Sequence, residues 1–408
     1  MEEFLIERLG HQGDGIAVGP VFAPRTLPGE RVHGIRNGDR LSDVKIIEPS
    51  ETRVSPVCKH YKSCGGCSLQ HAAEPFVADY KQQIVQSALE AHGIKTELRP
   101  IETSPAQSRR RATFAVRRTK KGALWGFHSR GSDTVIAVPD CQLVQKDLLL
   151  VAPLLDDLAL IGGSRKGEMA VTVTTSEVGL DVFVKGGKPL DRELTLGLSG
   201  LVEKHQLARL TWDDEVIGMR NPPFQRFGSA RVTPPPGAFL QATHHGQDVL
   251  TNAVMEAVSG ARGVDLFAGC GTFTLPLAER SEMLGVEGDK AMTQALDAGW
   301  RKASGLKKVQ AVARDLFRRP LMPDELKHFD FAVLDPPRAG AEAQIAEITQ
   351  SALSEIAYVS CNPVTFARDA KTLIDTGFCL EWVQVVDQFR WSPHVELAAK
   401  FARAHMQG

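Results

Sequence analysis

Cys361 stands at a point of the chain where a reactive thiol could be presented. The β-prone run at residues 356–360 leads into it, Asn362-Pro363 ends that run, and residues 364–376 have the pattern of a helix. A thiol at a strand-to-helix turn is exposed at the carboxyl edge of a sheet, near the positive end of the helix, which favours the thiolate. The position therefore suits a nucleophile, although a lone intracellular cysteine is more often a small buried hydrophobe.

A group of cysteines lies far upstream. Cys58, Cys64 and Cys67 fall within ten residues, two glycines separate the last two, and Cys141 could supply a fourth thiolate. Four thiolates form a soft-ligand site that can hold an iron–sulfur cluster or a structural zinc ion. Such a zinc site usually carries two C-x2-C pairs, and only one is present here. The tight spacing argues against unrelated buried cysteines.

The C-terminal part of the chain has the pattern of a cofactor-binding fold. From Gly237 onward strand-like and helix-like segments alternate, which predicts a doubly wound parallel sheet. Its first turn contains Gly269 and Gly271, which let the backbone approach a ligand closely. Thr274 stands where a dinucleotide fingerprint has its third glycine, and Glu287 ends the next strand, where a carboxylate can accept hydrogen bonds from ribose hydroxyls. Together these features favour S-adenosylmethionine.

A basic stretch without any acidic residue occupies residues 108–131. Aromatic side chains and one histidine are interleaved with its cations, as phosphate contact and base stacking require. The alternating pattern predicts strands, so the charges should lie on a sheet face or its hairpin. A solvated surface is the alternative. The cations are Arg109, Arg110, Arg111, Arg117, Arg118, Lys120, Lys121 and Arg130, and the rings are Phe114, Trp125, Phe127 and His128.

The elements that must position these residues divide the chain into three expected domains. Short strands cut by Gly and Pro at residues 4–47 predict a small β-barrel of the OB type, which could bind RNA or only pack on a neighbour. A proline-rich linker at residues 234–236 precedes the alternating pattern. We therefore expect a barrel at 1–56, a β-rich cysteine-containing and RNA-binding domain at 57–236, and a cofactor-binding α/β domain at 237–408.

Composition limits the class of protein. The 408 residues are 43 % hydrophobic and 24 % charged with a net charge of −1, which is ordinary for a globular protein and does not by itself point to nucleic acid. The acidic N-terminus shows no secretory signal, and the apolar run at 148–161 is too short to span a bilayer. Seven cysteines are an odd number for a disulfide framework. We expect a cytoplasmic monomer that contacts no membrane.

The whole chain, in order, resembles the uracil-5 RNA methyltransferases of bacteria that carry an iron–sulfur cluster. The first 56 residues resemble the TRAM domain found in RNA-modifying enzymes. The motifs C-x5-C-G-G-C, FLQ at 239–241, DLFAGCG, LDPPRAG, SCNP and HVE then follow in the family's order. This resemblance favours a [4Fe-4S] cluster held by the four cysteines over zinc.

The resemblance also implies roles for individual residues. It makes Cys361 the nucleophile and Glu396 the proton acceptor. Thr272 stands where many members have Asn, and Asp315 where some do, but both side chains can still hydrogen-bond. The positions that correspond to the family's S-adenosylmethionine contacts are Gln241, Phe267, Thr272, Glu287, Asp315 and Asp335.

The implied reaction is methylation of a uridine at C5 through a covalent Cys–C6 adduct. Methyltransferases that act on exocyclic amines tend to have an aromatic residue after Asp335-Pro336-Pro337, and Arg338 stands there instead. The target expected from the family is a uridine of 23S rRNA. The T-loop uridine of tRNA is the alternative, and a non-catalytic iron–sulfur RNA-binding or redox-sensing protein is a more distant one.

Overall fold

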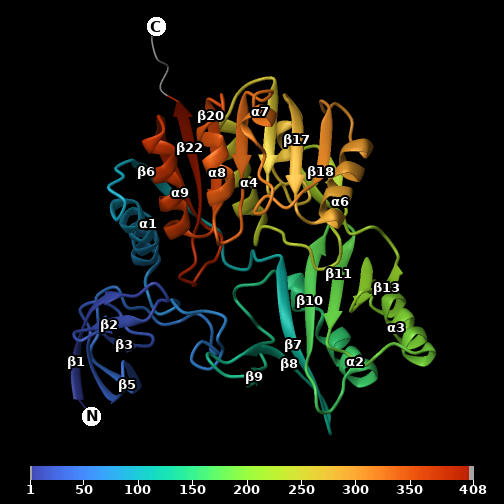
Figure 1. The fold of residues 1–408 in the computed structure, drawn as a ribbon. Helices are drawn as coiled ribbons and strands as arrows, with labels where there is room; N and C mark the ends of the chain where they lie inside the picture. Colours follow the sequence, from blue (N-terminus) through green and yellow to red (C-terminus); the bar gives the residue numbers. More distant parts are fainter. Residues whose placement is uncertain (1, 404–408) are drawn as a thin grey trace.

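The computed structural model describes residues 2–403, which form three units (Figure 1). A large sheet with its helices lies at the top of the view, a small barrel at the lower left, and a second sheet at the lower right. The parallel strands of the large sheet point with their carboxyl ends toward the other two units. This is the edge of the sheet to which the sequence assigned the chemistry.

The N-terminal unit is a closed barrel, as predicted. Its strands follow the order β1-β2-β3-β5-β4 around a small core that includes Ile6, Val21 and Val32. Gly15 is needed here, because a Cβ on it would lie 2.1 Å from Thr26 Oγ1. The strands are β1 (Glu2–Leu9), β2 (Gly15–Ala17), β3 (Val21–Ala23), β4 (Arg31–Asn37) and β5 (Arg40–Glu48).

The central unit is a seven-stranded sheet in the order β13-β12-β11-β10-β7-β8-β9. Helices α2 (Ala152–Gly162) and α3 (Arg192–Lys204) bury their leucines against it around Trp212. A separate hairpin, β14 (Gln225–Phe227) and β15 (Ala230–Val232), leads to the C-terminal unit. The strands are β7 (Arg111–Thr119), β8 (Gly122–His128), β9 (Val135–Ile136), β10 (Met169–Ser176), β11 (Gly179–Lys185), β12 (Arg209–Trp212) and β13 (Glu215–Met219).

The C-terminal unit is the predicted doubly wound sheet, with strand order β18-β17-β16-β19-β20-β22-β21-β6. Its first five strands are parallel, and β22 runs antiparallel to β20 and β21. The strands are β16 (Arg262–Leu266), β17 (Glu282–Glu287), β18 (Val309–Ala313), β19 (Phe331–Leu334), β20 (Glu355–Ser360), β21 (Phe378–Asp387), β22 (Glu396–Arg403) and β6 (Glu97–Thr103).

Both faces of this sheet are covered. Alternate residues of β19 belong to different hydrophobic cores. Ala332 and Leu334 pack into one core, and Phe331 and Val333 pack into the other. One core contains residues of α1 (Glu74–Glu90), α8 (Glu342–Thr349) and α9 (Pro363–Asp375), and the other those of α4 (His244–Ala257) and α6 (Lys290–Lys302). The helix that follows the glycine turn, α5 (Thr274–Leu277), is short.

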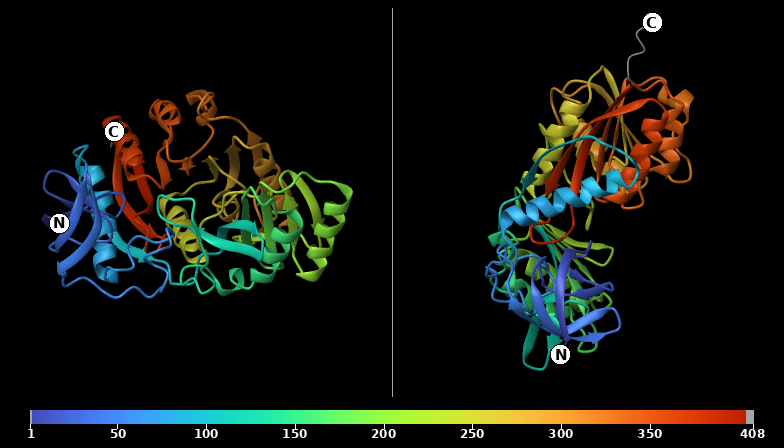
Figure 2. Two further views of the ribbon diagram at one scale, coloured as in Figure 1. Left: turned by 90° about the horizontal axis from the view of Figure 1, so that it is seen from below. Right: turned by 90° about the vertical axis from the view of Figure 1, so that its left-hand side faces the viewer.

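Two elements of the segment 57–236 belong with the large sheet. Strand β6 pairs with β21, and α1 lies between the barrel and the C-terminal unit (Figure 2). Tyr80 of α1 donates a hydrogen bond to the Gly10 carbonyl of the barrel at 2.7 Å, and Lys81 forms a buried ion pair with Asp387 at the end of β21. The segment from α1 to β6 thus packs with the C-terminal sheet although it precedes residue 236.

Within residues 2–403 no helix has the length and apolar character needed to cross a membrane.

Candidate active site

Strand register gathers the predicted site residues at one edge of the sheet. In the parallel ladder, Leu266 pairs with Leu334, and the residues that follow each strand emerge side by side. Neighbouring strands of the same sheet deliver the others to this edge, since β17 pairs with β18, and β20 with β19 and β22. The residues that follow or end these strands are Phe267, Glu287, Asp315, Asp335 and Cys361, with Glu396 at the start of β22.

Cys361 and Glu396 are placed opposite one another. Ser360 pairs with Leu397 in the antiparallel ladder. Cys361 follows Ser360 and Glu396 precedes Leu397, so the two residues face each other across the strands. Cys361 is half-buried, and Asn362 caps α9 by accepting a hydrogen bond from the Val364 N–H at 3.1 Å. The strand-to-helix position inferred from the sequence is confirmed.

The structure does not support the thiolate form of Cys361 that the sequence favours. Burial, together with the carboxylates of Glu396 and Asp335, raises the pKa of Cys361 to about 11, although Arg338 acts in the opposite sense. These effects raise the pKa of the thiol, which is the opposite of the direction expected from the helix N-terminus.

The carboxyl groups of this edge are also shifted. Burial raises the pKa of Glu396 to about 7, while a hydrogen bond from Gln388 and the charge of Arg338 hold it lower than it would otherwise be. Burial, Glu396 and Glu287 raise the pKa of Asp335 well above its ordinary value. A carboxyl group that titrates near neutrality is suited to take up and release protons.

The glycine turn after β16 has the backbone shape expected of a ligand cradle. Phe267, Gly269 and Gly271 all have positive φ, at 65°, 55° and 99°. The carboxylate of Glu287 accepts a hydrogen bond from the Gly269 N–H at 3.0 Å, so it joins the end of β17 to the turn. Thr272 lies half-buried within the same turn. Two strand ends and the turn thus form one continuous surface.

The remaining two predicted cofactor positions lie on either side of this surface. The Asp315 carboxylate caps its own loop by accepting from the Phe317 N–H at 3.0 Å, and the rings of Phe317 and Phe267 lie 5.4 Å apart. Gln241 is buried in the segment before α4, and its side-chain oxygen accepts a hydrogen bond from Gln388 at 2.6 Å. Sequence reasoning missed Gln388, since no motif marks it.

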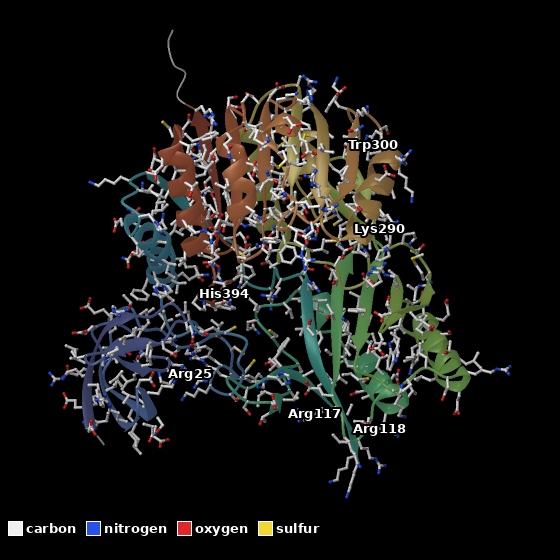
Figure 3. All side chains as sticks on the ribbon, viewed as in Figure 1. Arg25, Arg117, Arg118, Lys290, Trp300 and His394 are labelled. Carbon is white, nitrogen blue, oxygen red and sulfur yellow. The ribbon has the colours of Figure 1, made fainter. Side chains whose placement is uncertain are left out.

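The guanidinium of Arg338, in the turn after β19, lies 3.3 Å from His394 Nδ1 at the solvent-exposed rim of the site. His394 is at the lower edge of the C-terminal unit in Figure 3, facing the space beside the barrel and the central sheet. Arg25 is on the barrel side of that space, and Arg117 and Arg118 are on β7. Arg117 and Arg118 lie toward the end of β7 that points away from the C-terminal unit (Figure 3).

The four upstream cysteines come together. They line a single cavity of about 320 Å³ with Arg109, and Cys141 comes from the loop after β9. All four are free thiols. Within residues 2–403 no three His, Cys, Asp or Glu side chains are close enough together to hold one metal ion. The thiols therefore surround a space instead of converging on a point.

The basic stretch is only partly a surface feature. Arg110 is fully buried and donates hydrogen bonds to the Gln241 carbonyl at 2.9 Å and to Gln247 at 2.8 Å. Arg111 donates to the Gly237 carbonyl at 3.0 Å, and Arg117 pairs with Glu168 at 2.7 Å. Several of the expected phosphate contacts are thus structural, because β7 passes under the segment that leads to α4.

Two further members of the stretch line or approach the cysteine cavity. Arg109 lies at its wall, and Arg130 pairs with the buried Asp14 of the barrel at 2.6 Å. Phe114 is buried against Trp125 and Phe127, so these rings form core contacts. Arg118, Lys120 and Lys121, at the β7–β8 hairpin, remain as candidates for RNA contact.

The fold is shared with known RNA-modifying enzymes. The chain superposes on the crystal structure of Pyrococcus abyssi tRNA (uracil-54, C5)-methyltransferase, solved with S-adenosyl-L-homocysteine, with a TM-score of 0.77 over 98 % of this chain and 99 % of that one, at 21 % identity. The two chains therefore share one fold.

Sequence comparison identifies the family. A model of the tRNA (uracil-5-)-methyltransferase family matches residues 236–403. An uncharacterized RNA methyltransferase of Brucella suis is 41 % identical over 97 % of both chains, and the 23S rRNA (uracil(1939)-C(5))-methyltransferase RlmD of Vibrio vulnificus is 30 % identical over 98 % of this chain and 96 % of its own. The chain belongs to the uracil-5 RNA methyltransferase family, and it is an RNA methyltransferase.

The charge arrangement makes a prediction about thiol reactivity. Replacing Glu396 with Gln removes an anion that raises the pKa of Cys361, so at about pH 8 alkylation of Cys361 by iodoacetamide should accelerate roughly threefold to tenfold. Peptide mass spectrometry would measure the rate relative to the exposed Cys379 in the same molecule. An unchanged ratio would show that Glu396 does not act on the sulfur electrostatically.

Proposed function

We propose that the protein transfers a methyl group from S-adenosylmethionine to C5 of a uridine in 23S rRNA. The observation that carries this proposal is the register of β20 and β22, which sets a thiol and a buried carboxyl group opposite each other beside the glycine turn. A nucleophile for one face of a pyrimidine, a proton acceptor and a cofactor cradle are then within one site. Gln241, Phe267, Thr272, Glu287, Asp315 and Asp335 would hold the cofactor.

The fit of that cofactor rests on the turn after β16. The Gly269 N–H donates to the Glu287 carboxylate at 3.0 Å and the Gly271 N–H to the Ala268 carbonyl at 2.9 Å, so internal hydrogen bonds hold the turn in shape. A Cβ on Gly269 would have nothing closer than 3.8 Å, so the space in front of the turn is open. S-adenosylmethionine supplies an electrophilic methyl group when bound.

Cys361 would make the uracil carbon reactive. After the thiol loses its proton, the sulfur forms a bond to C6, and the electron pair of the C5–C6 double bond moves to C5 and O4 as an enolate. C5 then takes the methyl group while the donor leaves as a neutral thioether. Glu396 removes the remaining C5 proton, and that electron pair re-forms the double bond and expels the thiolate. Arg338, at the rim, would stabilise negative charge on the ring.

A uridine inside folded RNA must be unpaired or flipped out to reach this edge, at a cost of a few kcal/mol. The hairpin cations Arg118, Lys120 and Lys121, the barrel and Arg338 would offset that cost through phosphate and ring contacts. We propose that RNA is the sole macromolecular partner, that the enzyme is a cytoplasmic monomer, and that the barrel, the cysteine-containing unit and the methyltransferase unit are its domains.

The choice of 23S rRNA is supported by the 30 % identity to the Vibrio vulnificus enzyme across nearly the whole chain. The alternative is a T-loop uridine of tRNA. It is supported by the fold that this chain shares with the Pyrococcus abyssi tRNA (uracil-54, C5)-methyltransferase.

Mapping 5-methyluridine in rRNA and tRNA from a strain without the gene would decide between them. We expect 5-methyluridine to be lost at one rRNA position while its level in tRNA is unchanged. The intact gene should restore the modification, and a copy with Cys361→Ala should not. Loss in tRNA alone would select the alternative substrate.

The covalent mechanism predicts opposite behaviour of two variants. Cys361→Ala should form no denaturant-stable adduct with RNA that carries 5-fluorouridine, because the sulfur that attacks C6 is absent. Glu396→Gln should form an adduct with ordinary uridine RNA that it cannot resolve, because the C5 proton stays in place. Denaturing gel electrophoresis measures both. An adduct in the alanine variant would remove Cys361 from its role.

For the cysteine cavity we propose a [4Fe-4S] cluster held by Cys58, Cys64, Cys67 and Cys141. A cluster needs four thiolates around a volume larger than one ion, and the proposal is supported by the four cysteines lining one cavity of about 320 Å³. Gly65 and Gly66 let the loop turn tightly, since a Cβ on Gly65 would lie 2.8 Å from the His128 carbonyl. The cluster would hold this loop in shape. No step of methyl transfer uses it.

The proposed cluster predicts a metal content. Protein purified without oxygen should contain about four iron and four sulfide ions per chain. Cys67→Ser should lower both, whereas Cys379→Ser, an exposed cysteine outside the cavity, should leave them unchanged. Iron and sulfide assays with metal analysis would measure this. Stoichiometric zinc in the unaltered protein would contradict the cluster.

A further inference from the structure

Gln388 occupies the connection between β21 and β22, directly after the strand that ends at Asp387. Its side chain is 2 % exposed. The next strand begins at Glu396, which pairs with Val386 across the hairpin, so Gln388 lies beside the base of the proposed site. No sequence motif covers this residue, and neither the nucleophile nor the cofactor cradle accounts for it.

The side-chain amide of Gln388 joins three groups that belong to different segments. Its nitrogen donates one hydrogen bond to Glu396 Oε2 at 2.9 Å and another to Gln241 Oε1 at 2.6 Å. Its oxygen accepts the Ala242 N–H at 2.8 Å. A backbone N–H can only donate, so the amide oxygen must face Ala242, and both amide hydrogens must face the other two groups. The orientation of the amide is therefore fixed by the main chain.

The surroundings are shaped to hold this amide. A Cβ on Gly246, in the first turn of α4, would lie 2.7 Å from Gln388 Cβ, so the glycine provides its space. The buried Arg110 donates from its side chain to the Gln241 carbonyl at 2.9 Å and from its backbone N–H to the Ala242 carbonyl at 3.0 Å. The acceptor side of the network is thus rigid.

We propose that Gln388 is a positioning residue that holds Glu396 as an ionised, correctly oriented base and ties it to the cofactor-side residue Gln241. This inference rests on the proposed function, since it concerns the residue proposed there to remove the C5 proton. An amide N–H makes a stronger hydrogen bond to a carboxylate than to a protonated carboxyl group, so it stabilises the ionised form. Gln388 therefore favours the form of Glu396 that can accept a proton.

The other charged groups around Glu396 do not replace this effect. Asp335, at the end of β19, repels the carboxylate, and a Cys361 thiolate after β20 would do the same. Arg338 attracts it from the exposed rim. Of the groups that act on Glu396 from the surrounding elements, Gln388 is the one that makes a direct hydrogen bond, in a buried place where such a bond is strongest.

The sign of the pH effect follows. Glu396 must be ionised to take the C5 proton, so removal of that proton slows as pH falls through its pKa of about 7. Loss of the hydrogen bond from Gln388 destabilises the carboxylate and raises that pKa. The acidic limb of the pH profile should then move to higher pH by about one unit, and the rate at about pH 7 should fall roughly fivefold.

The test is the decay of the methylated covalent adduct in single turnover, followed on denaturing gels across pH. Gln388→Met keeps the volume of the side chain and removes both donors. We expect slower decay at neutral pH, recovery at higher pH and a weaker affinity for S-adenosylhomocysteine, because Gln241 loses its partner. Gln388→Glu, which keeps the acceptor for Ala242, should shift the limb upward further, since it adds a like charge.

A matched control is Gln344→Met. Gln344 is another buried glutamine whose amide pairs with main-chain groups, those of Leu321, away from Glu396. The Gln344→Met variant should lose a comparable amount of stability without moving the acidic limb of the pH profile. Thermal unfolding of each variant distinguishes an effect on folding from an effect on the reaction. If Gln388→Met does not fold, Gln388→Glu is used for the test.

The outcomes separate this inference from the function on which it rests. If Cys361→Ala still forms the adduct, the proposed function fails. If Cys361→Ala is inactive and Glu396→Gln accumulates adduct, but the folded Gln388 variants show the unaltered acidic limb, only the positioning role of Gln388 is overturned.

Discussion

Crowding of negative charge at the carboxyl edge of the large sheet is the constraint on which the rest of the site depends. Glu287, Asp335 and Glu396 reach the same edge because neighbouring strands deliver them there, and a thiol stands among them. Burial raises the pKa values of Asp335, Glu396 and Cys361, and neighbouring carboxyl groups add to the effect at Asp335 and Cys361. Glu396, whose pKa is raised to about 7, is suited to exchange a proton near neutrality.

The same edge is attached to the rest of the molecule through the loop between β21 and β22. The Trp391 carbonyl accepts hydrogen bonds from Ser68 and Leu69, at 2.8 and 3.0 Å, directly after the last cysteine of the upstream loop. Lys81 of α1 pairs with Asp387 at the start of the same connection. Breaking such a buried pair typically costs about 3–5 kcal/mol, because one charge is left without a partner. The geometry around Glu396 thus depends on elements more than 300 residues earlier in the chain.

This arrangement gives the cysteine-lined cavity a physical place in the enzyme. The cavity lies beside the loop that supports the connection to β22, and Arg109, at its wall, precedes Arg110, which supports Gln241. Residues that a linear reading assigns to RNA binding therefore connect the cysteine cavity with the site at the sheet edge. The exposed hairpin cations are left to contact phosphate, where screening by salt makes binding reversible.

The sequence by itself determined the parallel sheet, the small barrel, the family and the strand-to-helix position of Cys361. These follow from local periodicity, from glycines and prolines at turns, and from motifs with fixed order. It could not determine the ionisation of Cys361, because that depends on carboxylates supplied by β19 and β22, far away in the chain. It could not distinguish the buried Arg110 from the exposed Lys120, since both occur in the same run of cations.

Only the tertiary structure decided that β6 joins the large sheet and that Gln388 contacts Glu396. A glutamine carries no periodic or motif signal, and its partners are set by the register of two strands and the path of the segment before α4. Local patterns are written in neighbouring residues and can be read from the chain. Desolvation and hydrogen bonding between distant segments arise only when the fold brings those segments together.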